Sequence, residues 1–236
     1  MKRLTLAIFL LGGLNVGAIA QNLEAVLDNY LKASGVSEPG SIQSMYVSME
    51  MNSQGNTMPM EMYLQRPDKI NITMAVMDQE MIINMNGDES WMINPMSGSS
   101  EPGPLPPGQE GTFDEAMKNM DGRFADYKNN LDDYEYLGTE NIEGKEYSKV
   151  KAKVSMAGEE IETINYFDNS NHMLVRQTMS LMGQPAENSL ENYQEVDGYN
   201  LPFVTTTKID GSVVSKVTFL KVEINQEIDP AIFAKP

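Results

Sequence analysis

The sequence predicts a mainly β protein built on one large, strongly curved antiparallel sheet of about 11 to 12 strands. Short apolar segments alternate with polar residues at period 2 along most of the chain. Turn-forming pairs such as Asn86-Gly87, Asp197-Gly198 and Asp210-Gly211 separate these segments and favour hairpins between neighbouring strands. Only two stretches have helical periodicity, so we expect helices to cover the concave face of the sheet.

The first 20 residues have the form of a cleavable secretory signal peptide. Lys2 and Arg3 precede an apolar run from Leu4 to Leu14, and Ala18-Ile19-Ala20 matches the small-residue cleavage pattern. This apolar run is too short to serve as a membrane span. Since the chain has no cysteine, it has neither a lipid-attachment cysteine nor a disulfide. We therefore expect a soluble periplasmic protein whose single domain is residues 21–236.

The charge of the chain argues against nucleic acid as a partner. The formal net charge is −17, and loss of Lys2 and Arg3 with the signal peptide changes it by −2 to −19, since residues 1–20 contain no acidic residue. Such a surface repels nucleic acid and anionic lipid headgroups. We expect a monomer that binds no nucleic acid.

Two stretches of the chain have the periodicity of amphipathic helices. The first follows Asn22, which can cap it, and ends at Gly35. The second follows a loop at 97–111 that is rich in proline and glycine. This helix is predicted to open at Thr112, because Glu115 three residues later would complete a capping box.

Strand-like segments lie on both sides of the second predicted helix. Because short turns connect most neighbours, successive strands are expected to pair antiparallel as a meander. The predicted strands are 42–52, 58–65, 69–76, 80–86, 89–94, 134–138, 146–154, 160–167, 172–180, 189–196, 201–209 and 213–223.

Methionine is concentrated in the first half of the predicted sheet, often at alternate positions. Alternate residues of a strand share one face, so these strands build a sheet face lined with flexible thioethers. The chain contains 19 methionines, although an ordinary core would favour residues with better defined rotamers. The candidate ligand-binding residues on this face and on the second helix are Met49, Met51, Met58, Met60, Met62, Leu64, Ile70, Ile72, Met74, Val76, Met81, Ile83, Met85, Trp91, Ile93, Met117 and Met120.

The methionine pattern has three interpretations. An apolar pocket for acyl chains or other lipids would use thioethers because they adapt to ligands of variable shape. A Cu(I) site would use thioethers that lie two residues apart on one face, as in Met49 and Met51 and in Met58, Met60 and Met62. An envelope protein could instead use its methionines only to fill the core. We predict no cofactor.

The sequence carries no recognisable catalytic constellation. His172 is the single histidine, and there is neither a cysteine nor a G-x-S-x-G motif that could pair a nucleophile with a base. His172 follows a turn signal, so we expect it on the surface. The sequence therefore predicts a protein that is not an enzyme.

The segment Tyr63-Leu64-Gln65-Arg66-Pro67 resembles a corner of the periplasmic carriers that sort lipoproteins to the outer membrane, the LolA-like family. Further resemblances follow in the family's order, at 86–95, 193–203 and 229–233. They imply an unclosed β-barrel with a helical lid, which holds lipoprotein acyl chains in an apolar cavity. The sequence departs from the family pattern in one respect: it has methionines at positions where many relatives carry Leu, Val or aromatic residues.

The same resemblance implies partners and a role for one residue. The donor of the lipoprotein would be an inner-membrane lipoprotein-releasing ABC transporter, and an outer-membrane acceptor would receive it. Arg66 would bond to the lid and help to keep it closed. The guanidinium group suits this role because it has five donors on a rigid fork.

Overall fold

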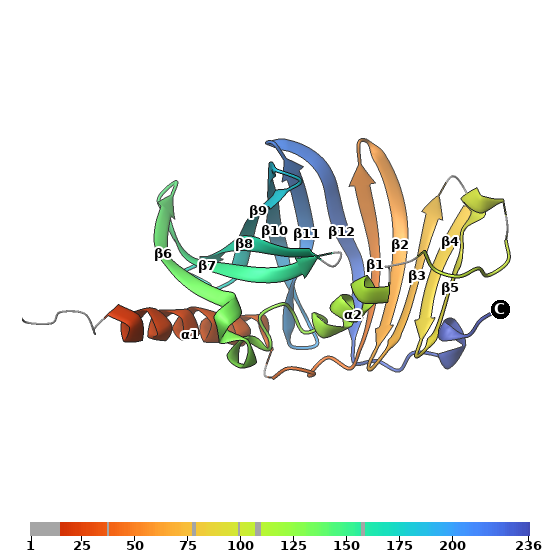
Figure 1. Ribbon diagram of the computed structural model, residues 1–236, viewed down its shortest axis with the longest axis horizontal. Helices are drawn as coiled ribbons and strands as arrows, with labels where there is room; N and C mark the ends of the chain where they lie inside the picture. The colour runs from red at the N-terminus through yellow and green to blue at the C-terminus, as the bar shows by residue number, and fades with distance from the viewer. Residues whose placement is uncertain (1–14, 37, 77–78, 99, 107–109, 157–158) are drawn as a thin grey trace, which may run out of the picture.

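The computed structural model describes residues 15–236 except 37, 77–78, 99, 107–109 and 157–158. Within these residues one antiparallel sheet has the strand order β5-β4-β3-β2-β1-β12-β11-β10-β9-β8-β7-β6, and Figure 1 shows its strong curvature. The mainly β class and the open, curved sheet predicted from the sequence are confirmed. The strands are β1 (Ser44–Ser53), β2 (Asn56–Gln65), β3 (Lys69–Val76), β4 (Gln79–Asn86), β5 (Glu89–Ile93), β6 (Tyr134–Ile142), β7 (Lys145–Met156), β8 (Glu159–Asp168), β9 (Leu174–Leu181), β10 (Gln184–Val196), β11 (Tyr199–Ile209) and β12 (Ser212–Ile224).

The strand boundaries follow the alternation of the sequence closely, with two informative differences. β6 continues past Gly138 to Ile142, because a bulge between Tyr136 and Thr139 absorbs the irregularity that the glycine introduces. β10 begins at Gln184, five residues before the predicted start, because the tight turn after β9 continues the ladder directly.

Both predicted helices begin earlier than expected. Helix α1 spans Asn15–Ser34, so Asn22 lies inside it, and so do residues 18–20 of the predicted cleavage site. Residues 1–14 of the predicted signal peptide lie outside the described residues. Helix α2 spans Glu110–Lys118, so the prediction that Thr112 caps it was wrong. No proline follows residue 107 before the helix, so nothing prevents the earlier start.

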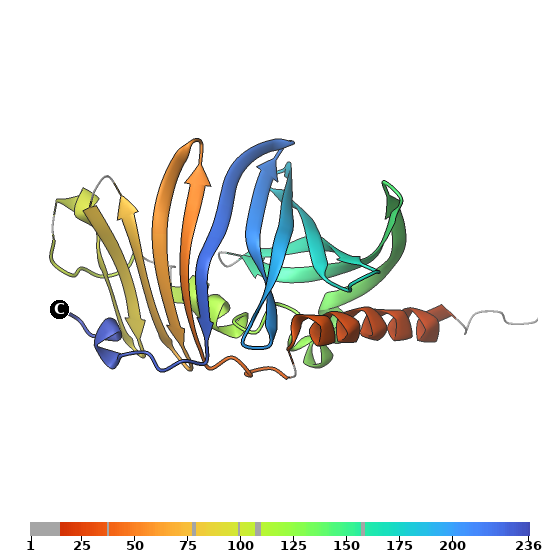
Figure 2. The same cartoon turned by 180° about the vertical axis from the view of Figure 1, so that it is seen from behind.

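The concave face of the sheet carries two separate apolar cores. One lies between α1 and strands β6–β9, and the other lies between α2 and strands β1–β4, β11 and β12. Figure 1 shows α2 in front of the middle of the sheet and α1 along its lower edge, and Figure 2 shows the same sheet from behind. Among the described residues, no helix is long and apolar enough to cross a membrane.

Aromatic side chains dominate the core beneath α1. The Phe124 ring lies 5.6 Å from Tyr30, 5.4 Å from Phe167 and 5.8 Å from Tyr134, measured between ring centroids. The hydroxyl of the fully buried Tyr127 donates a hydrogen bond of 2.8 Å to Asp28 Oδ1 on α1. This core therefore joins α1 to the segment that follows α2.

The buried tyrosines predict that the protein loses stability at alkaline pH. Burial raises the pKa of Tyr30 to about 12, and burial together with the Asp28 carboxylate raises the pKa of Tyr127 further. Above pH 10 the unfolded chain releases these protons while the folded chain retains them, so the unfolding free energy falls as pH rises. We expect a slope of about 1.4 kcal/mol per pH unit for each such tyrosine between pH 10 and 12.

Urea denaturation of the protein at pH 8, 9, 10 and 11 measures this slope. The variant Tyr127→Phe removes one of the titrating groups and should give a shallower slope than the wild type. An unfolding free energy that stayed constant from pH 9 to 11 would contradict the prediction.

The C-terminal segment packs on the opposite, convex face of the sheet. The 3-10 helix η4 (Pro230–Phe233) buries Phe233, and the amide groups of Asn71 and Asn84 donate hydrogen bonds to the Ile232 carbonyl at 3.1 and 3.3 Å. Asn71 and Asn84 are directly opposite each other on β3 and β4. The convex side of these two strands is therefore covered by the chain itself, which leaves their concave side as the candidate binding face.

Candidate functional site

The concave side of β1–β4 is an apolar surface, which we call the methionine face. Residues that are directly opposite in an antiparallel ladder share one face of the sheet, and the ladders connect the alternate apolar residues of all four strands. Met49, Met60, Met74 and Met81 are aligned in this way into an unbroken row across the four strands. The methionine face consists of Met45, Val47, Met49, Met51, Met58, Met60, Met62, Leu64, Ile70, Ile72, Met74, Val76, Met81, Ile83 and Met85.

Helix α2 packs onto the end of this face that is farther from the β1–β2 and β3–β4 hairpins. Phe113, Met117 and Met120 recur at i, i+4 and i+7, and all three are buried. They belong to one core with Val47 and Leu64 of the sheet. Met117 and Met120 therefore pack against the methionine face, and their contact with a ligand stays a prediction.

Four methionines of the methionine face lie outside the core that α2 closes. Met51, Met58, Met74 and Met81 are half-buried and occupy the hairpin end of the methionine face. We call them the rim methionines. In Figure 1 the β1–β2 and β3–β4 hairpins point upward, away from α2, so this part of the concave face is not covered by the helix.

Two of the predicted ligand-binding residues do not lie on the methionine face. Trp91 is directly opposite Asn84, and Ile93 is directly opposite Ile82. Both partners alternate with Met81, Ile83 and Met85 along β4, so Trp91 and Ile93 lie on the convex side. The prediction that these two residues line the concave face was wrong. β5 is short, and its sequence alone does not show which residues pair with β4.

Asp121 lies in the turn three residues after α2 ends, and its carboxylate is almost fully buried. Asp121 Oδ1 accepts a hydrogen bond of 2.6 Å from the Ile42 amide, and Asp121 Oδ2 accepts one of 2.8 Å from the Gly40 amide. The Ser41 hydroxyl donates a third bond of 3.3 Å to Oδ1. These contacts connect the end of α2 to the segment that joins α1 to β1.

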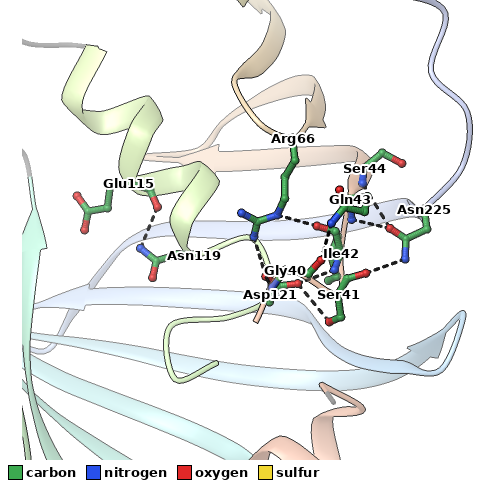
Figure 3. A network of polar contacts seen from close by, with 10 residues as sticks. All are labelled: Gly40, Ser41, Ile42, Gln43, Ser44, Arg66, Glu115, Asn119, Asp121 and Asn225. Carbon is green, nitrogen blue, oxygen red and sulfur yellow. Dashed lines mark hydrogen bonds and ion pairs between the residues drawn. The ribbon is translucent and has the colours of Figure 1, made fainter. Parts of the chain in front are cut away.

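Arg66 provides the ionic partner of this carboxylate (Figure 3). Arg66 Nη2 lies 2.6 Å from Asp121 Oδ2, and Arg66 Nε donates a hydrogen bond of 2.9 Å to the Ile42 carbonyl. The Arg66 amide also donates to the Gln43 carbonyl at 2.9 Å. The guanidinium is therefore fixed at the β2–β3 corner and bonds both to Asp121 and to the segment before β1. We call the Arg66–Asp121 pair with residues 40–42 the latch.

The family resemblance singled out Arg66, whose role in closing the lid stays a prediction, but Asp121 was not predicted. The available signal was the pair Asp121-Gly122 directly after the apolar stripe of the helix, where a polar residue follows the buried Met120. The chain has 33 other Asp and Glu residues, and the sequence does not distinguish Asp121 from them. Only the fold shows that this carboxylate is nearly inaccessible to solvent. Buried carboxylates require partners, and here four donors supply them.

A solvent-accessible cavity of about 440 Å³ lies beside the latch, between the end of α2 and strands β6 and β7. Arg66, Lys118, Arg123 and Lys153 contribute positive charge to its lining, together with acidic residues that include Glu115 and Asp121. Burial lowers the pKa of the Arg123 guanidinium, and the nearby Glu115 carboxylate opposes this shift. The polar lining distinguishes this cavity from the methionine face on the other side of α2.

His172 lies on the surface in the turn before β9, where its backbone has a positive φ of 63° and its amide bonds to the Asp168 carbonyl. Strand β9 starts at Leu174, so the predicted strand 172–180 began two residues too early. In the part of the chain that the structure describes, no group of three or more His, Cys, Asp or Glu side chains could hold a metal ion.

The chain is similar to several solved structures over most of its length. A LolA superfamily protein from Nitrosomonas europaea is 15% identical, with a TM-score of 0.57 over 90% of this chain and 97% of that chain. A putative outer membrane lipoprotein-sorting protein domain from Vibrio parahaemolyticus is 12% identical, with a TM-score of 0.58 over 91% and 98%. The chain has a LolA-like fold. The LolA-like fold that the sequence resemblance implies is therefore confirmed.

A DUF1329 family protein from Desulfovibrio piger has a similar structure, with 13% identity and a TM-score of 0.56 over 90% of this chain and 97% of that chain. No protein-family model and no curated protein sequence matches the chain. At these low identities the comparisons establish the LolA-like fold, and the site must be argued from the side chains of this chain.

Proposed function

We propose that the chain is an exported, non-catalytic carrier that binds the acyl chains of lipoproteins, or another lipid, on the methionine face and moves them toward the outer membrane. The observation that carries this proposal is an apolar concave face covered by the short helix α2 and by Leu105 of the preceding loop, with an ion pair between Arg66 and the buried Asp121 directly after the helix.

The energetics of acyl-chain burial suit such a carrier. Each shielded methylene contributes about 0.8 kcal/mol, so ten methylenes contribute about 8 kcal/mol relative to water. Release then requires a second state with a lower affinity, and movement of α2 between closed and open positions provides two states. We propose an inner-membrane lipoprotein-releasing ABC transporter as the donor and an outer-membrane protein as the acceptor.

Arg66 is proposed to keep α2 closed through Asp121 until a partner or a ligand opens it. The direct 2.6 Å contact between the two side chains supports this role. The similarity of the fold to lipoprotein-sorting structures favours a lipid ligand over the Cu(I) alternative.

Lipid analysis of the protein purified from the periplasm of a Gram-negative host tests this function. We expect mass spectrometry of the denatured extract to find acyl lipid or lipoprotein in stoichiometric amounts. Met62→Gln, which places a polar side chain of similar size on the methionine face, should reduce the recovered lipid. Met182→Gln makes the same change at an exposed turn residue and should leave the amount of recovered lipid unchanged. An extract without lipid, together with no crosslink to any lipoprotein, would refute the proposal.

A further inference from the structure

The rim methionines differ from the other methionines of the concave face because they lie outside the core that α2 closes; Met45, Met60 and Met62 are also half-buried, but they pack against that core. Met49 and Met85 on the sheet, like Met117 on α2, are each less than 10% exposed. The four rim methionines are half-buried, and they lie beyond the core that α2 closes. Small polar molecules in the solvent can therefore reach these four thioethers while α2 stays latched.

An accessible thioether is a site of oxidation. The sulfur lone pair attacks one oxygen of a hydroperoxide, so that an S–O bond forms and the O–O bond breaks. The sulfur is oxidised by two electrons to the sulfoxide, and hydrogen peroxide is reduced to water. The product is polar and chiral in place of a flexible apolar side chain.

We propose that the rim methionines are a modification site, at which oxidation to the sulfoxide by peroxide lowers the affinity of the methionine face for acyl chains. This inference rests on the proposed function. Met51 is directly opposite Met58, and Met74 is directly opposite Met81, so four sulfoxides would form one polar band across the hairpin end. A methylene chain lying over this band would lose apolar contact and cover polar oxygens that it cannot hydrogen-bond.

The latch end of the face retains its structure during this reaction. Leu64, Ile70 and Val47 occupy the rows beneath α2 and cannot be oxidised by peroxide. The methionines of these rows, Met45, Met62 and Met85, are packed in the core that α2 closes. Met117 and Met120 are buried and should react only when α2 opens. Oxidation of the rim therefore changes binding without unfolding the sheet, and a reductase for methionine sulfoxide would reverse it.

The chain also contains methionines that serve as internal controls. Met182 in the β9–β10 turn is fully exposed, and Met96 is more than half exposed. Neither belongs to the methionine face. Both should be oxidised at least as fast as the rim, but their oxidation should not alter binding.

The test treats the full mature protein with hydrogen peroxide, maps sulfoxides by peptide mass spectrometry, and measures affinity for a synthetic triacylated lipopeptide. We expect about tenfold weaker binding once the rim methionines are oxidised. A variant with leucine at all four rim positions should keep, after peroxide treatment, the affinity that it has before treatment. The Met96→Leu, Met182→Leu variant should lose affinity on oxidation as the wild type does. Bound lipopeptide should slow oxidation of the rim but not of Met182.

The outcomes separate this inference from the function on which it rests. If the reduced protein does not bind the lipopeptide, the proposed function is refuted. If the reduced protein binds and full oxidation of the rim leaves the affinity unchanged, the modification site is refuted while the carrier function stands. Loss of affinity that occurs equally in the four-leucine variant would also refute the modification site. Circular dichroism before and after treatment excludes unfolding as the cause of any loss.

Discussion

Replacement of Asp121 by asparagine is expected to lower the unfolding free energy by about 3 kcal/mol and to release α2 from the sheet. The substitution keeps the size of the side chain but removes the charge that pairs with Arg66 at 2.6 Å. It also replaces one carboxylate oxygen, to which the Gly40 amide, the Ile42 amide or Arg66 donates, with an amide group that cannot accept. Urea denaturation measures the loss of stability, and hydrogen exchange of the amides at 113–120 measures the release of α2.

Asp114→Asn is the matched control, since Asp114 is an exposed aspartate of α2. It should change the unfolding free energy by no more than about 0.5 kcal/mol. A double-mutant cycle with Arg66→Leu isolates the energy of the ion pair, because the second substitution should cost little once the first has been made. Additive effects of the two substitutions, or unchanged exchange at 113–120 in Asp121→Asn, would contradict a latch formed by this pair.

Most of the sheet could be predicted because its determinants are local. Period-2 alternation and turn pairs such as Asp210-Gly211 act within a few residues, so the twelve strands follow directly from the sequence. The face of β1–β4 on which methionine is concentrated also follows, since alternation assigns each side chain to one side.

The parts that could not be predicted depend on contacts between distant residues. Asp121 meets Ile42 across 79 positions and Arg66 across 55 positions, and no local pattern encodes either pairing. Trp91 is a large aromatic residue of the kind that often lines binding sites. Its place on the convex side depends on its register with β4, which the sequence does not show. The LolA-like resemblance identified the arginine of the latch, but the acid that it binds required the structure.

Separation of the two concave cores determines which part of the molecule can move. Gly122 has a φ of +94°, a conformation that glycine adopts readily, and it stands between the latch at Asp121 and the buried Phe124. Phe124 and Tyr127 anchor the following segment in the core beneath α1. We therefore propose that α2 rotates at Gly122 when the latch opens, while the α1 core stays intact.

Phe124→Ala should accordingly destabilise the protein far more than the equivalent truncation on α2. Removal of the almost fully buried Phe124 ring leaves a cavity among Tyr30, Tyr134 and Phe167, and the expected loss is about 4 kcal/mol. Met117→Ala also removes a buried side chain, but its cost cannot exceed the free energy that docks α2. Beyond that limit the open form becomes the native state, so we expect a loss below about 2 kcal/mol.

Urea denaturation of both variants, combined with hydrogen exchange, distinguishes these two responses. Phe124→Ala should lower the protection of amides throughout β6–β9, whereas Met117→Ala should lower it only in α2 and in the sheet residues beneath the helix. If Met117→Ala cost as much as Phe124→Ala and exposed the whole sheet, α2 would be part of the global folding unit. A helix that cannot open separately could not admit and release an acyl chain, so this comparison tests the physical basis of the carrier directly.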